Sequence, residues 1–431
     1  MNDAIDQLPE EIRGQLRQAG RLADESGLAL YLVGGTVRDL LLGRARTDID
    51  LAVEGDGMEF AARLARASGG RCAPNPRFLT ATVEMPEGHS LDVATARSET
   101  YERPGALPRV ASASMDVDLA RRDFTINAMA VSLNGRSFGE LVDPFEGGAD
   151  LRKKRVRILH DRSFIDDPTR LFRAVRFEQR LRFRLERGTE RRFREAVAQD
   201  MIGHLSGPRL LEQLKLVCFE PDPWLVFNRL EGLEVLRAIH PALGSDEGLK
   251  TLVREISPSG APASPAGSPP TPAGDGWWIL YLVALFGPHR AETLQGVVDR
   301  LKPNRRLRKA IEDMSRWSAV ERAVASGEID TPADFFHAVR SISEDTMLFV
   351  TLTHPDEGMR KRCETYYHQH RHLRLSIDGG TLKDLGIAEG PAYGRILEGV
   401  LSMKINGEIG NAEEERSAAR DLGARLHRPE S

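Results

Sequence analysis

The hydrophobic positions in the first third of the chain follow two different periods. Short apolar runs and apolar–polar alternation are typical of strands, and they occur at residues 29–35, 48–54, 79–85 and 89–96. Helices are predicted at residues 36–43 and 59–70, the second being amphipathic and closed by glycines. Residues 99–114 are polar and contain proline and glycine, so we expect a loop of the kind that moves or carries function.

From about Phe164 onward the patterns are helical and the strand signals end. Residues 166–186 predict one long helix that is crowded with arginine. Residues 277–287 form the longest apolar run, which falls short of the ~20 residues of a membrane span, so we expect a buried helix. Residues 257–276 are rich in proline, alanine, glycine and serine, and they predict a disordered insertion within the helical part.

Composition limits the partners and the location of the protein. The chain has 431 residues with 41% hydrophobic and 29% charged content, which is typical of a globular protein. The formal net charge of −4 means that any surface for a polyanion must be local. Three separated cysteines favour a reducing compartment, and we find no signal peptide or membrane span. We therefore expect a cytoplasmic protein that does not contact a membrane.

Two aspartates of the second predicted strand suggest a metal site. Side chains at i and i+2 of a strand share a face, so Asp48 and Asp50 point the same way. Two carboxylates this close repel each other unless a cation lies between them. Mg²⁺ prefers oxygen ligands and binds one or two carboxylates together with substrate phosphates. Asp92, on a neighbouring predicted strand, is a candidate third ligand.

Two glycines at the end of the first predicted strand suggest a phosphate site. Gly34 and Gly35 leave the strand and open a helix, which directs backbone N–H groups and the positive helix end at an anion. A phosphate-bearing substrate held there would meet the metal at its other end, and metal ions can stabilise an in-line phosphoryl displacement. No GxxxxGK[ST] sequence occurs, so the site is not a P-loop.

Each of these fragments alone has an ordinary interpretation. An isolated DxD is usually a solvated strand edge, and an isolated pair of glycines is usually only a turn. Their combination in one strand–turn–helix–strand unit favours nucleotidyl transfer.

Several longer motifs resemble one enzyme family. Residues 32–53, "LVGGTVRDLLLGRARTDIDLAV", resemble the signature of the class II tRNA nucleotidyltransferase/poly(A) polymerase family, whose members build or extend RNA 3′ ends without a nucleic-acid template. "RRDFTINAMA" at 121–130 is similar to its second motif. Further matches follow in the same order at residues 143–159, 166–177 and 375–397. The resemblance covers nearly the whole chain apart from the proline-rich insertion.

The second motif has a structural and a functional interpretation. Its apolar residues predict a helix packed beneath the sheet, which Asp123 would cap, while Arg122 would pair with an acidic neighbour. The resemblance implies instead that Arg122 and Asp123, and with them Asn127, line the nucleotide pocket near the sugar and phosphates. We also expect Arg38, Arg173 and Arg176 to bind the nucleotide.

A carboxylate and a guanidinium in the "DDPTR" motif suggest how a base is selected. Asp167 and Arg170 stand three residues apart on the predicted helix, so their side chains would be neighbours. Cytosine and adenine both present an amino donor beside a ring-nitrogen acceptor, which this pair complements, whereas uracil and guanine leave buried polar groups unpaired. The alternative is an ordinary surface ion pair. Asp166 stands where the family usually has glutamate, which leaves its role open.

An arginine-rich stripe follows this motif. Arg180, Arg182 and Arg184 belong to it, and we expect them to bind RNA phosphates because arginine is concentrated here in a slightly acidic protein. The alternative is a solvated helix face. The phenylalanines among these arginines are expected in the core.

The resemblance implies an α+β fold with an N-terminal polymerase-β-like nucleotidyltransferase head containing a mixed sheet, followed by an all-α neck, body and tail. The expected boundaries are 1–158 for the catalytic head, 159–220 for the neck with the nucleotide-selecting helix, 221–330 for the body with the insertion, and 331–431 for the tRNA-binding tail.

The expected activity is Mg²⁺-dependent addition of C, A or both from CTP and ATP to the tRNA 3′ end, with release of pyrophosphate. The expected partner is the acceptor arm of tRNA, and no obligate protein partner is evident. Addition of CC only, addition of A only, poly(A) synthesis and a catalytically silent RNA-binding protein remain open.

Overall fold

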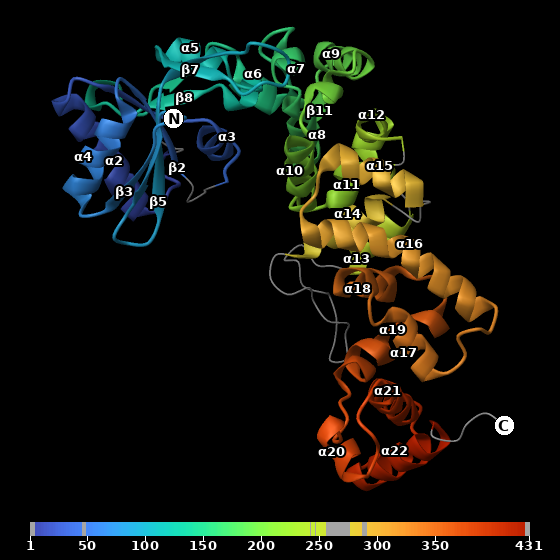
Figure 1. The fold of residues 1–431 in the computed structure, drawn as a ribbon. Helices are drawn as coiled ribbons and strands as arrows, with labels where there is room; N and C mark the ends of the chain where they lie inside the picture. Colours follow the sequence, from blue (N-terminus) through green and yellow to red (C-terminus); the bar gives the residue numbers. More distant parts are fainter. Residues whose placement is uncertain are drawn as a thin grey trace. The chain divides into compact units, whose positions relative to one another are not determined.

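The chain folds into two compact units. The computed structural model describes residues 5–44, 49–241, 243–245, 247–255, 276–286 and 291–426. The units are Met1–Ile239 and His240–Ser431, which Figure 1 colours from blue to yellow-green and from yellow to red. The expected division into four parts is finer than this, and its boundaries stay a prediction.

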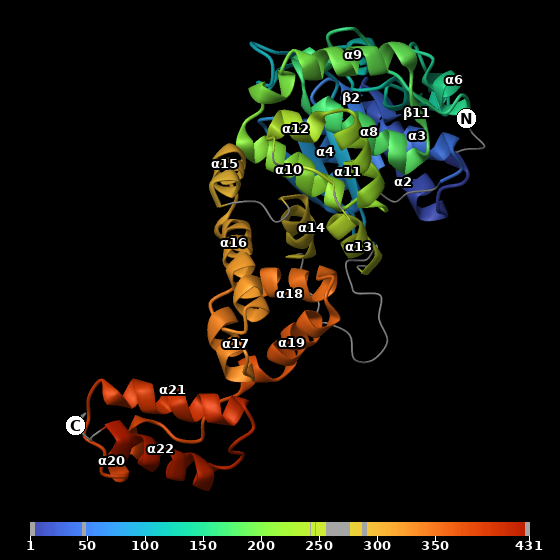
Figure 2. The same ribbon diagram turned by 90° about the vertical axis from the view of Figure 1, so that its right-hand side faces the viewer.

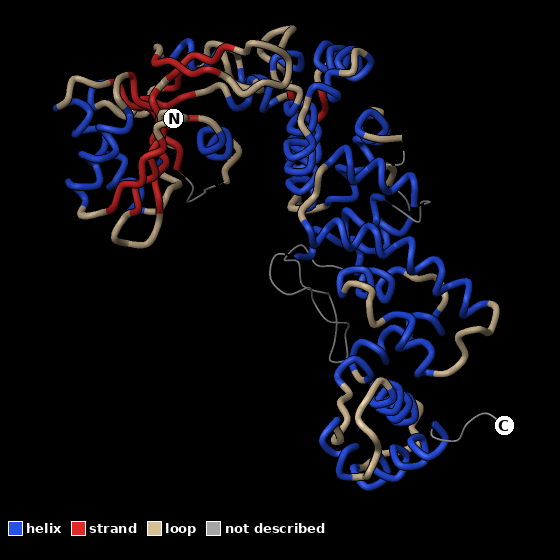
Figure 3. The backbone as a smooth tube through the Cα atoms, in the orientation of Figure 1, coloured by secondary structure: helices blue, strands red, loops and turns tan. Residues whose placement is uncertain are grey.

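Seven strands of the first unit form one mixed sheet in the order β3-β4-β5-β2-β1-β8-β9 (red in Figure 3). Their bounds are Ala29–Val33 (β1), Ile49–Glu54 (β2), Arg71–Asn75 (β3), Thr80–Glu84 (β4), Ser90–Thr95 (β5), Ala130–Ser132 (β8) and Leu141–Val142 (β9). β2 and β5 run parallel, and the other neighbours are antiparallel. The four predicted strands are therefore confirmed, with β4 and β5 forming the expected pair.

Two predicted helices of this unit are also confirmed. α3 (Gly35–Leu41) connects β1 to β2, and α4 (Gly57–Ser68) packs on β3, β4 and β5 beside α2 (Glu10–Glu25). The Asp56 side chain accepts hydrogen bonds from two N–H groups of the first turn of α4, and Gly69 ends the helix at φ +71°. A capping carboxylate and a left-handed glycine are the usual signals for the two ends of a helix.

The polar loop expected at 99–114 is mostly a hairpin. β6 (Arg97–Thr100) and β7 (Arg109–Ser112) form a separate two-stranded antiparallel sheet, and α5 (Met115–Ala120) follows it. Its strands are polar on both faces and give no alternating hydrophobic signal, so only the pairing of one with the other identifies them. The loop proper is the eight-residue tip between them.

The prediction of a helix within residues 121–130 is wrong. The segment contains only a 3₁₀ turn, η1 (Thr125–Asn127), before β8 begins at Ala130. Phe124, Ile126 and Met129 are fully buried as predicted. β8 pairs with β1 on one side and with β9 on the other, and this pairing takes the backbone groups that a helix would have used internally.

The prediction of a single long helix at residues 166–186 is also wrong. The segment is divided into the end of α7 (Ser163–Asp166), α8 (Thr169–Leu181) and β11 (Arg184–Leu185). Pro168 has no N–H and keeps the preceding Asp167 extended. Arg182 adopts φ +56° and ends α8, after which β11 pairs in parallel with β10 (Arg155–Val156).

The remaining elements of the first unit are helical. They are η2 (Gly135–Ser137), α6 (Gly147–Arg152), α9 (Arg187–Ala198), η3 (Met201–His204), α10 (Gly207–Cys218), α11 (Pro223–Gly232) and α12 (Val235–Ile239). α10 and α11 pack on α8, so α8 is held between the sheet-containing part and this helical layer. Its buried residues lie at helical spacing on one face.

The second unit is helical throughout the residues that are described. Its helices are α13 (Glu247–Glu255), α14 (Trp277–Phe286), α15 (Ala291–Leu301), α16 (Arg305–Ala325), α17 (Pro332–Val339), α18 (Glu344–Thr353), α19 (Glu357–His368), α20 (Gly379–Asp384), α21 (Ala392–Ile405) and α22 (Ala412–Leu426). α14 is the expected buried helix. Figure 2 shows α21 and α22 side by side, where they enclose a small core of their own with α20.

Two further expectations concern the helical part. None of the helices within the described ranges is both long and apolar enough to cross a lipid bilayer. The insertion expected at 257–276 lies outside the described residues apart from Gly276.

Candidate active site

A polar cavity of about 550 Å³ opens in the first unit. Its walls come from the β1–α3 turn, β2, the β6–β7 hairpin, the segment after α5, α8 and α10. The predicted site residues that line it are Gly34, Gly35, Arg38, Asp50, Arg122, Asp123, Asn127, Asp167, Arg170, Arg173 and Arg180. Folding therefore brings residues from three separate sequence motifs to one cavity.

The β1–α3 turn gives this cavity a narrow polar wall. Gly34 has φ +70°, and a Cβ there would lie 2.9 Å from Nη1 of Arg122 and 4.0 Å from Oδ2 of Asp50. The N–H of Gly34 is already used, because it donates to the carbonyl of Met129 at 3.3 Å. α3 begins directly after this turn, and no described side chain caps it. Glycine is needed here both for its backbone conformation and for this close approach.

The expected metal ligands are only partly described. Asp48 lies outside the described residues. Asp50 and Asp92 are exposed and are paired in register on the parallel strands β2 and β5, so their side chains leave the same face of the sheet. Asp50 lines the cavity, whereas Asp92 does not and accepts a hydrogen bond of 2.6 Å from the Thr82 hydroxyl. Within the described ranges no three His, Cys, Asp or Glu residues cluster as a metal site would require.

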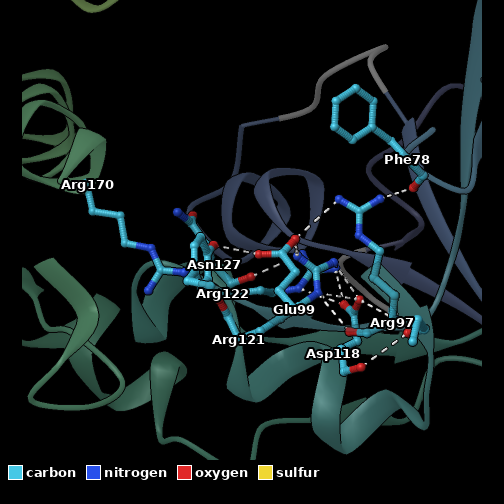
Figure 4. Close-up of polar contacts among 11 residues, drawn as sticks. Phe78, Arg97, Glu99, Asp118, Arg121, Arg122, Asn127 and Arg170 are labelled. Carbon is cyan, nitrogen blue, oxygen red and sulfur yellow. Dashed lines mark hydrogen bonds and ion pairs between the residues drawn. The ribbon is translucent and has the colours of Figure 1, made fainter. Parts of the chain in front are cut away.

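A buried carboxylate positions the arginines beside this turn. Asp118 is 1% exposed, and its two oxygens accept hydrogen bonds from Arg121 and from Arg122 (Figure 4). Burial by itself raises the pKa of Asp118, but the charges of Arg122 and Arg121 and their hydrogen bonds leave it lowered. Arg122 thus pairs with an acidic neighbour and also lines the cavity, so its two interpretations are compatible.

The base of the hairpin joins the same network. Glu99 accepts hydrogen bonds from Arg121 at 2.7 Å and from Arg97 at 3.4 Å (Figure 4). It also accepts one from the Tyr101 hydroxyl at 2.8 Å. Burial and the charge of Glu99 raise the pKa of Tyr101, so its hydroxyl remains a donor. Glu99 and Tyr101 both line the cavity.

A continuous chain of hydrogen bonds crosses the floor of the cavity. Arg38 pairs with Asp39 and donates to Oδ1 of Asn127 at 2.7 Å. Asn127 donates to Oδ1 of Asp123 at 3.0 Å, and Arg173 donates to the other oxygen of Asp123 at 2.5 and 2.8 Å. Burial by itself raises the pKa of Asp123, but the charge of Arg173 and the hydrogen bonds leave it lowered. These residues hold one another in fixed orientations.

Phe177 of α8 lies at the centre of an arginine cluster. The guanidinium carbons of Arg38, Arg173 and Arg180 lie 5.1, 5.6 and 5.6 Å from its ring centroid, which is within the range of cation–π attraction. The expected core position is confirmed, because Phe177 is 9% exposed. It also lines the cavity, so its ring is shared between the core and the site.

Asp167 and Arg170 meet at the cavity, but not as predicted. Asp167 precedes α8, whereas Arg170 lies in its first turn, so the two are not neighbours on one helix face. Oδ1 of Asp167 accepts hydrogen bonds from the N–H and hydroxyl of Thr169 and from Arg209. No described residue bonds its Oδ2. Arg170 is 5% exposed and donates to Ser163 and to the carbonyl of Arg121, each at 2.7 Å.

The rest of the arginine stripe lies outside this cavity. Arg176 pairs with the buried carboxylate of Glu220, which also pairs with Arg180. Arg182 and Arg184 are exposed. Asp166 lies outside the cavity as well, and it accepts a hydrogen bond from Arg162 at 3.2 Å. RNA binding by Arg182 and Arg184 stays a prediction.

Comparison with known proteins identifies the family. Residues 30–157 match the Poly A polymerase head domain. The A-adding tRNA nucleotidyltransferase of Geobacter sulfurreducens is 38% identical over 96% of this chain, which spans 47% of that protein's length. The A-adding tRNA nucleotidyltransferase of Halalkalibacterium halodurans is 33% identical over 94% of this chain and 92% of its own length. The chain belongs to the tRNA nucleotidyltransferase family.

Other members of the tRNA nucleotidyltransferase family match over nearly the whole chain. The CC-adding tRNA nucleotidyltransferase of Deinococcus radiodurans is 30% identical over 97% of this chain and 96% of its own length. A CCA-adding enzyme solved in an apo form superposes with a TM-score of 0.83 at 31% identity, covering 98% of this chain and 97% of that one. The Thermotoga maritima CCA-adding enzyme in complex with tRNA gives 0.75 at 30% identity, with 98% of both chains covered.

These matches confirm the predicted family and the mixed-sheet head followed by helices. Nucleotidyltransferases of this family generally use a divalent metal ion.

Several residues that line the cavity were not predicted as site residues from the sequence. They are Glu99, Tyr101, Arg121, Thr169, Phe177, Gln213 and Leu216. On α10, Arg209 beside Asp167 and the lining residues Gln213 and Leu216 recur at i, i+4 and i+7, so this spacing was the available signal for one functional helix face. The Oε1 atom of Gln213 is buried without a hydrogen-bond partner among the described residues.

Proposed function

We propose that this protein adds nucleotides from ATP, and in one alternative also from CTP, to the 3′ end of tRNA without a nucleic-acid template. The observation that carries this proposal is the convergence of Gly34 and Asp50, of Arg122 and Asp123, and of Asp167 and Arg170 on one cavity. The 3′-hydroxyl oxygen of the RNA attacks the α-phosphorus, the bond to the β-phosphate oxygen breaks, pyrophosphate leaves, and the hydroxyl proton passes to solvent.

We assign the phosphate end of the cavity to the β1–α3 turn and β2. Asp50 is an exposed carboxylate that lines the cavity, and carboxylate oxygens suit Mg²⁺. Asp50, with Asp48 and Asp92 as further candidates, would hold this ion, which when bound neutralises charge on the triphosphate. Arg122 faces the same turn and would bind phosphate oxygens, because its guanidinium is held in place by Asp118.

We assign the base end to Asp167 and Arg170. Oδ2 of Asp167 has no hydrogen bond from any described residue, and we assign it the role of accepting a hydrogen bond from the amino group of adenine or cytosine. Arg170 would donate to the adjacent ring nitrogen. Guanine and uracil present a carbonyl and a ring N–H at these positions and would leave both protein groups unpaired, which costs about 1–3 kcal/mol for each group.

Addition of a single A is the favoured product. Relatives named as A-adding are 38% and 33% identical over nearly the whole chain, against 30% for the CC-adding relative. Complete CCA addition is the second candidate, because CCA-adding enzymes solved with CTP and with ATP superpose with TM-scores of 0.79. A tRNA substrate implies a cytoplasmic location, and we assign Arg180, Arg182, Arg184 and the helices of residues 331–431 to tRNA binding.

Product lengths test these assignments. Three tRNA transcripts, ending before C, after C and after CC, are incubated with CTP alone, ATP alone and both. An A-adding enzyme extends only the transcript ending in CC, by one residue and only with ATP, whereas a CCA-adding enzyme extends all three. Asp48→Ala should abolish incorporation while the protein stays folded. Absence of incorporation by the wild type under all conditions would leave only an RNA-binding scaffold.

A further inference from the structure

Arg209 of α10 connects two parts of the site that are distant in sequence. One of its terminal nitrogens, Nη2, donates to Oδ1 of Asp167 at 3.0 Å. The other, Nη1, donates to the backbone carbonyl of Gly105 at the tip of the β6–β7 hairpin. One guanidinium therefore joins the hairpin tip to the carboxylate that faces the base end of the cavity.

The bonds that Asp167 makes come from two directions. Thr169 belongs to the same turn and donates its N–H and hydroxyl to Oδ1 at 3.1 and 2.8 Å. These local bonds fix the carboxylate only relative to its own backbone. The bond from Arg209 comes from a different helix, and it fixes the carboxylate relative to α10, which lines the cavity through Gln213 and Leu216. It is charge-assisted, which makes it roughly twice as strong as a neutral hydrogen bond.

The hairpin tip is held closely at the point where Arg209 binds it. Gly105 has φ +69°, and a Cβ there would lie 2.7 Å from the backbone carbonyl oxygen of His204 in η3. Only glycine allows the tip to approach η3 this closely. The base of the hairpin is held separately, because Glu99 bonds Arg121 and the carbonyl of Arg121 accepts a bond from Arg170. Each of the two base-facing side chains is thus connected to the hairpin through one arginine.

We propose that Arg209 is a positioning residue that orients Asp167 for base selection, and that it does so while bound to the docked hairpin tip. This inference rests on the proposed function, because it assigns the orientation of Asp167 a role in choosing the nucleotide. Loss of Arg209 leaves the carboxylate held only by Thr169, so the bond to a correct base weakens. GTP does not form that hydrogen bond, so loss of Arg209 changes the binding and incorporation of GTP less than those of ATP.

The test compares ATP with GTP in wild type and Arg209→Met. Two quantities are measured: kcat/KM for extension of the tRNA, and equilibrium binding of each nucleotide by calorimetry. We expect kcat/KM for ATP to fall about tenfold or more, as loss of a charge-assisted bond predicts, with a smaller fall for GTP. The ratio of kcat/KM for ATP to kcat/KM for GTP should therefore decrease. The ratio of the two binding constants, ATP over GTP, should decrease as well. An unchanged ratio in Arg209→Met would overturn the proposal.

Four further variants separate a positioning role of Arg209 from effects of folding and charge. Arg209→Lys keeps the charge but has no forked guanidinium to reach two acceptors. Its ATP/GTP ratio of kcat/KM should therefore resemble that of Arg209→Met. A ratio equal to that of the wild type would contradict the bridging role. Gly105→Ala should also lower the ATP/GTP ratio of kcat/KM. In the double variant with Arg209→Met the ratio should be no lower than in Arg209→Met alone, because both changes break the same connection. Arg229→Met is the matched control, because Arg229 pairs with Glu178 and Glu190 outside the cavity lining, and its ratio should be that of wild type.

Measurements on the wild type distinguish failure of the proposed function from failure of the role assigned to Arg209. Failure of the wild type to extend any tRNA would refute nucleotide addition. The binding ratio would still decide whether Arg209 orients Asp167 toward the base.

Discussion

Arg122 closes over Gly34, with its Nη1 atom 2.9 Å from the place that a Cβ on that glycine would occupy. The guanidinium cannot move away freely, because Nε and Nη2 are bonded to the buried Asp118 at 3.1 and 2.8 Å. The turn after β1 and the segment after α5 therefore form one rigid wall of the cavity.

Replacing this glycine should disable the site. Gly34→Ala places a methyl group against Arg122 and adds about 1–3 kcal/mol of backbone strain, because φ +70° with ψ −130° is a region that residues other than glycine rarely adopt. We expect kcat/KM for ATP to fall by about a hundredfold, measured by steady-state extension of tRNA. The matched control is Gly27→Ala, which has φ +66° and nothing within 4 Å of the new Cβ. Equal losses of activity in both variants would show that strain alone is responsible.

Asp50 should be needed for activity and not for folding. Asp50→Asn removes an exposed carboxylate that lines the cavity, so we expect the rate of incorporation to fall about a hundredfold to a thousandfold, the order expected when charge stabilisation of the transition state is lost. Thermal unfolding should be unchanged. Asp92→Asn is the comparison: if Asp92 is a ligand, half-maximal activity requires at least about tenfold more Mg²⁺, and an unchanged Mg²⁺ titration removes Asp92 from the site.

The carboxylate of Asp118 should make stability depend on pH. Because its pKa is lowered in the folded protein, the stabilisation is fully present above the ordinary value of 3.8 and is lost as the pH falls through the lower folded value. Asp118→Asn should unfold more easily at pH 7, by about 3 kcal/mol, because two arginines lose a buried partner. Urea unfolding between pH 7 and pH 3 should show this difference narrowing below about pH 4. A constant difference would contradict the assigned charge.

The ring of Phe177 should organise the arginines around it. Phe177→Leu keeps an apolar side chain but removes the π face, and cation–π contacts contribute about 0.5–1 kcal/mol each. We expect KM for ATP to rise about fivefold or more, with kcat less affected, and Phe177→Tyr to restore most of the binding. Phe193→Leu is the matched control, because Phe193 is fully buried against Phe164 and lines no part of the cavity. A rise in KM of the same size in the control would attribute the effect to packing.

The local patterns of the sequence were sufficient for much of the fold. β1, β2, β4, β5 and α4 were predicted because their periodicity and caps are encoded within each segment. The motifs also identified Gly34, Asp50, Arg122, Asp123, Asp167 and Arg170 as candidates, and all of them line one cavity.

The predictions that were wrong depended on contacts between segments. The segment after Asp123 looked helical, but the pairing of β8 with β1 decided its conformation. The hairpin of β6 and β7 has no hydrophobic alternation, so only the pairing of its two strands reveals it. The break before α8 is the exception, because Pro168 was visible in the sequence and its effect on Asp167 was local.

The sequence by itself determined the chemical groups of this protein and the family to which they point, since these depend on residue type and short-range spacing. The tertiary structure decided which groups meet. Arg209 reaches Asp167 and Gly105 across 42 and 104 positions, and Arg173 reaches Asp123 across 50. Such contacts form only when separate elements pack together, so no local period along the chain can encode them.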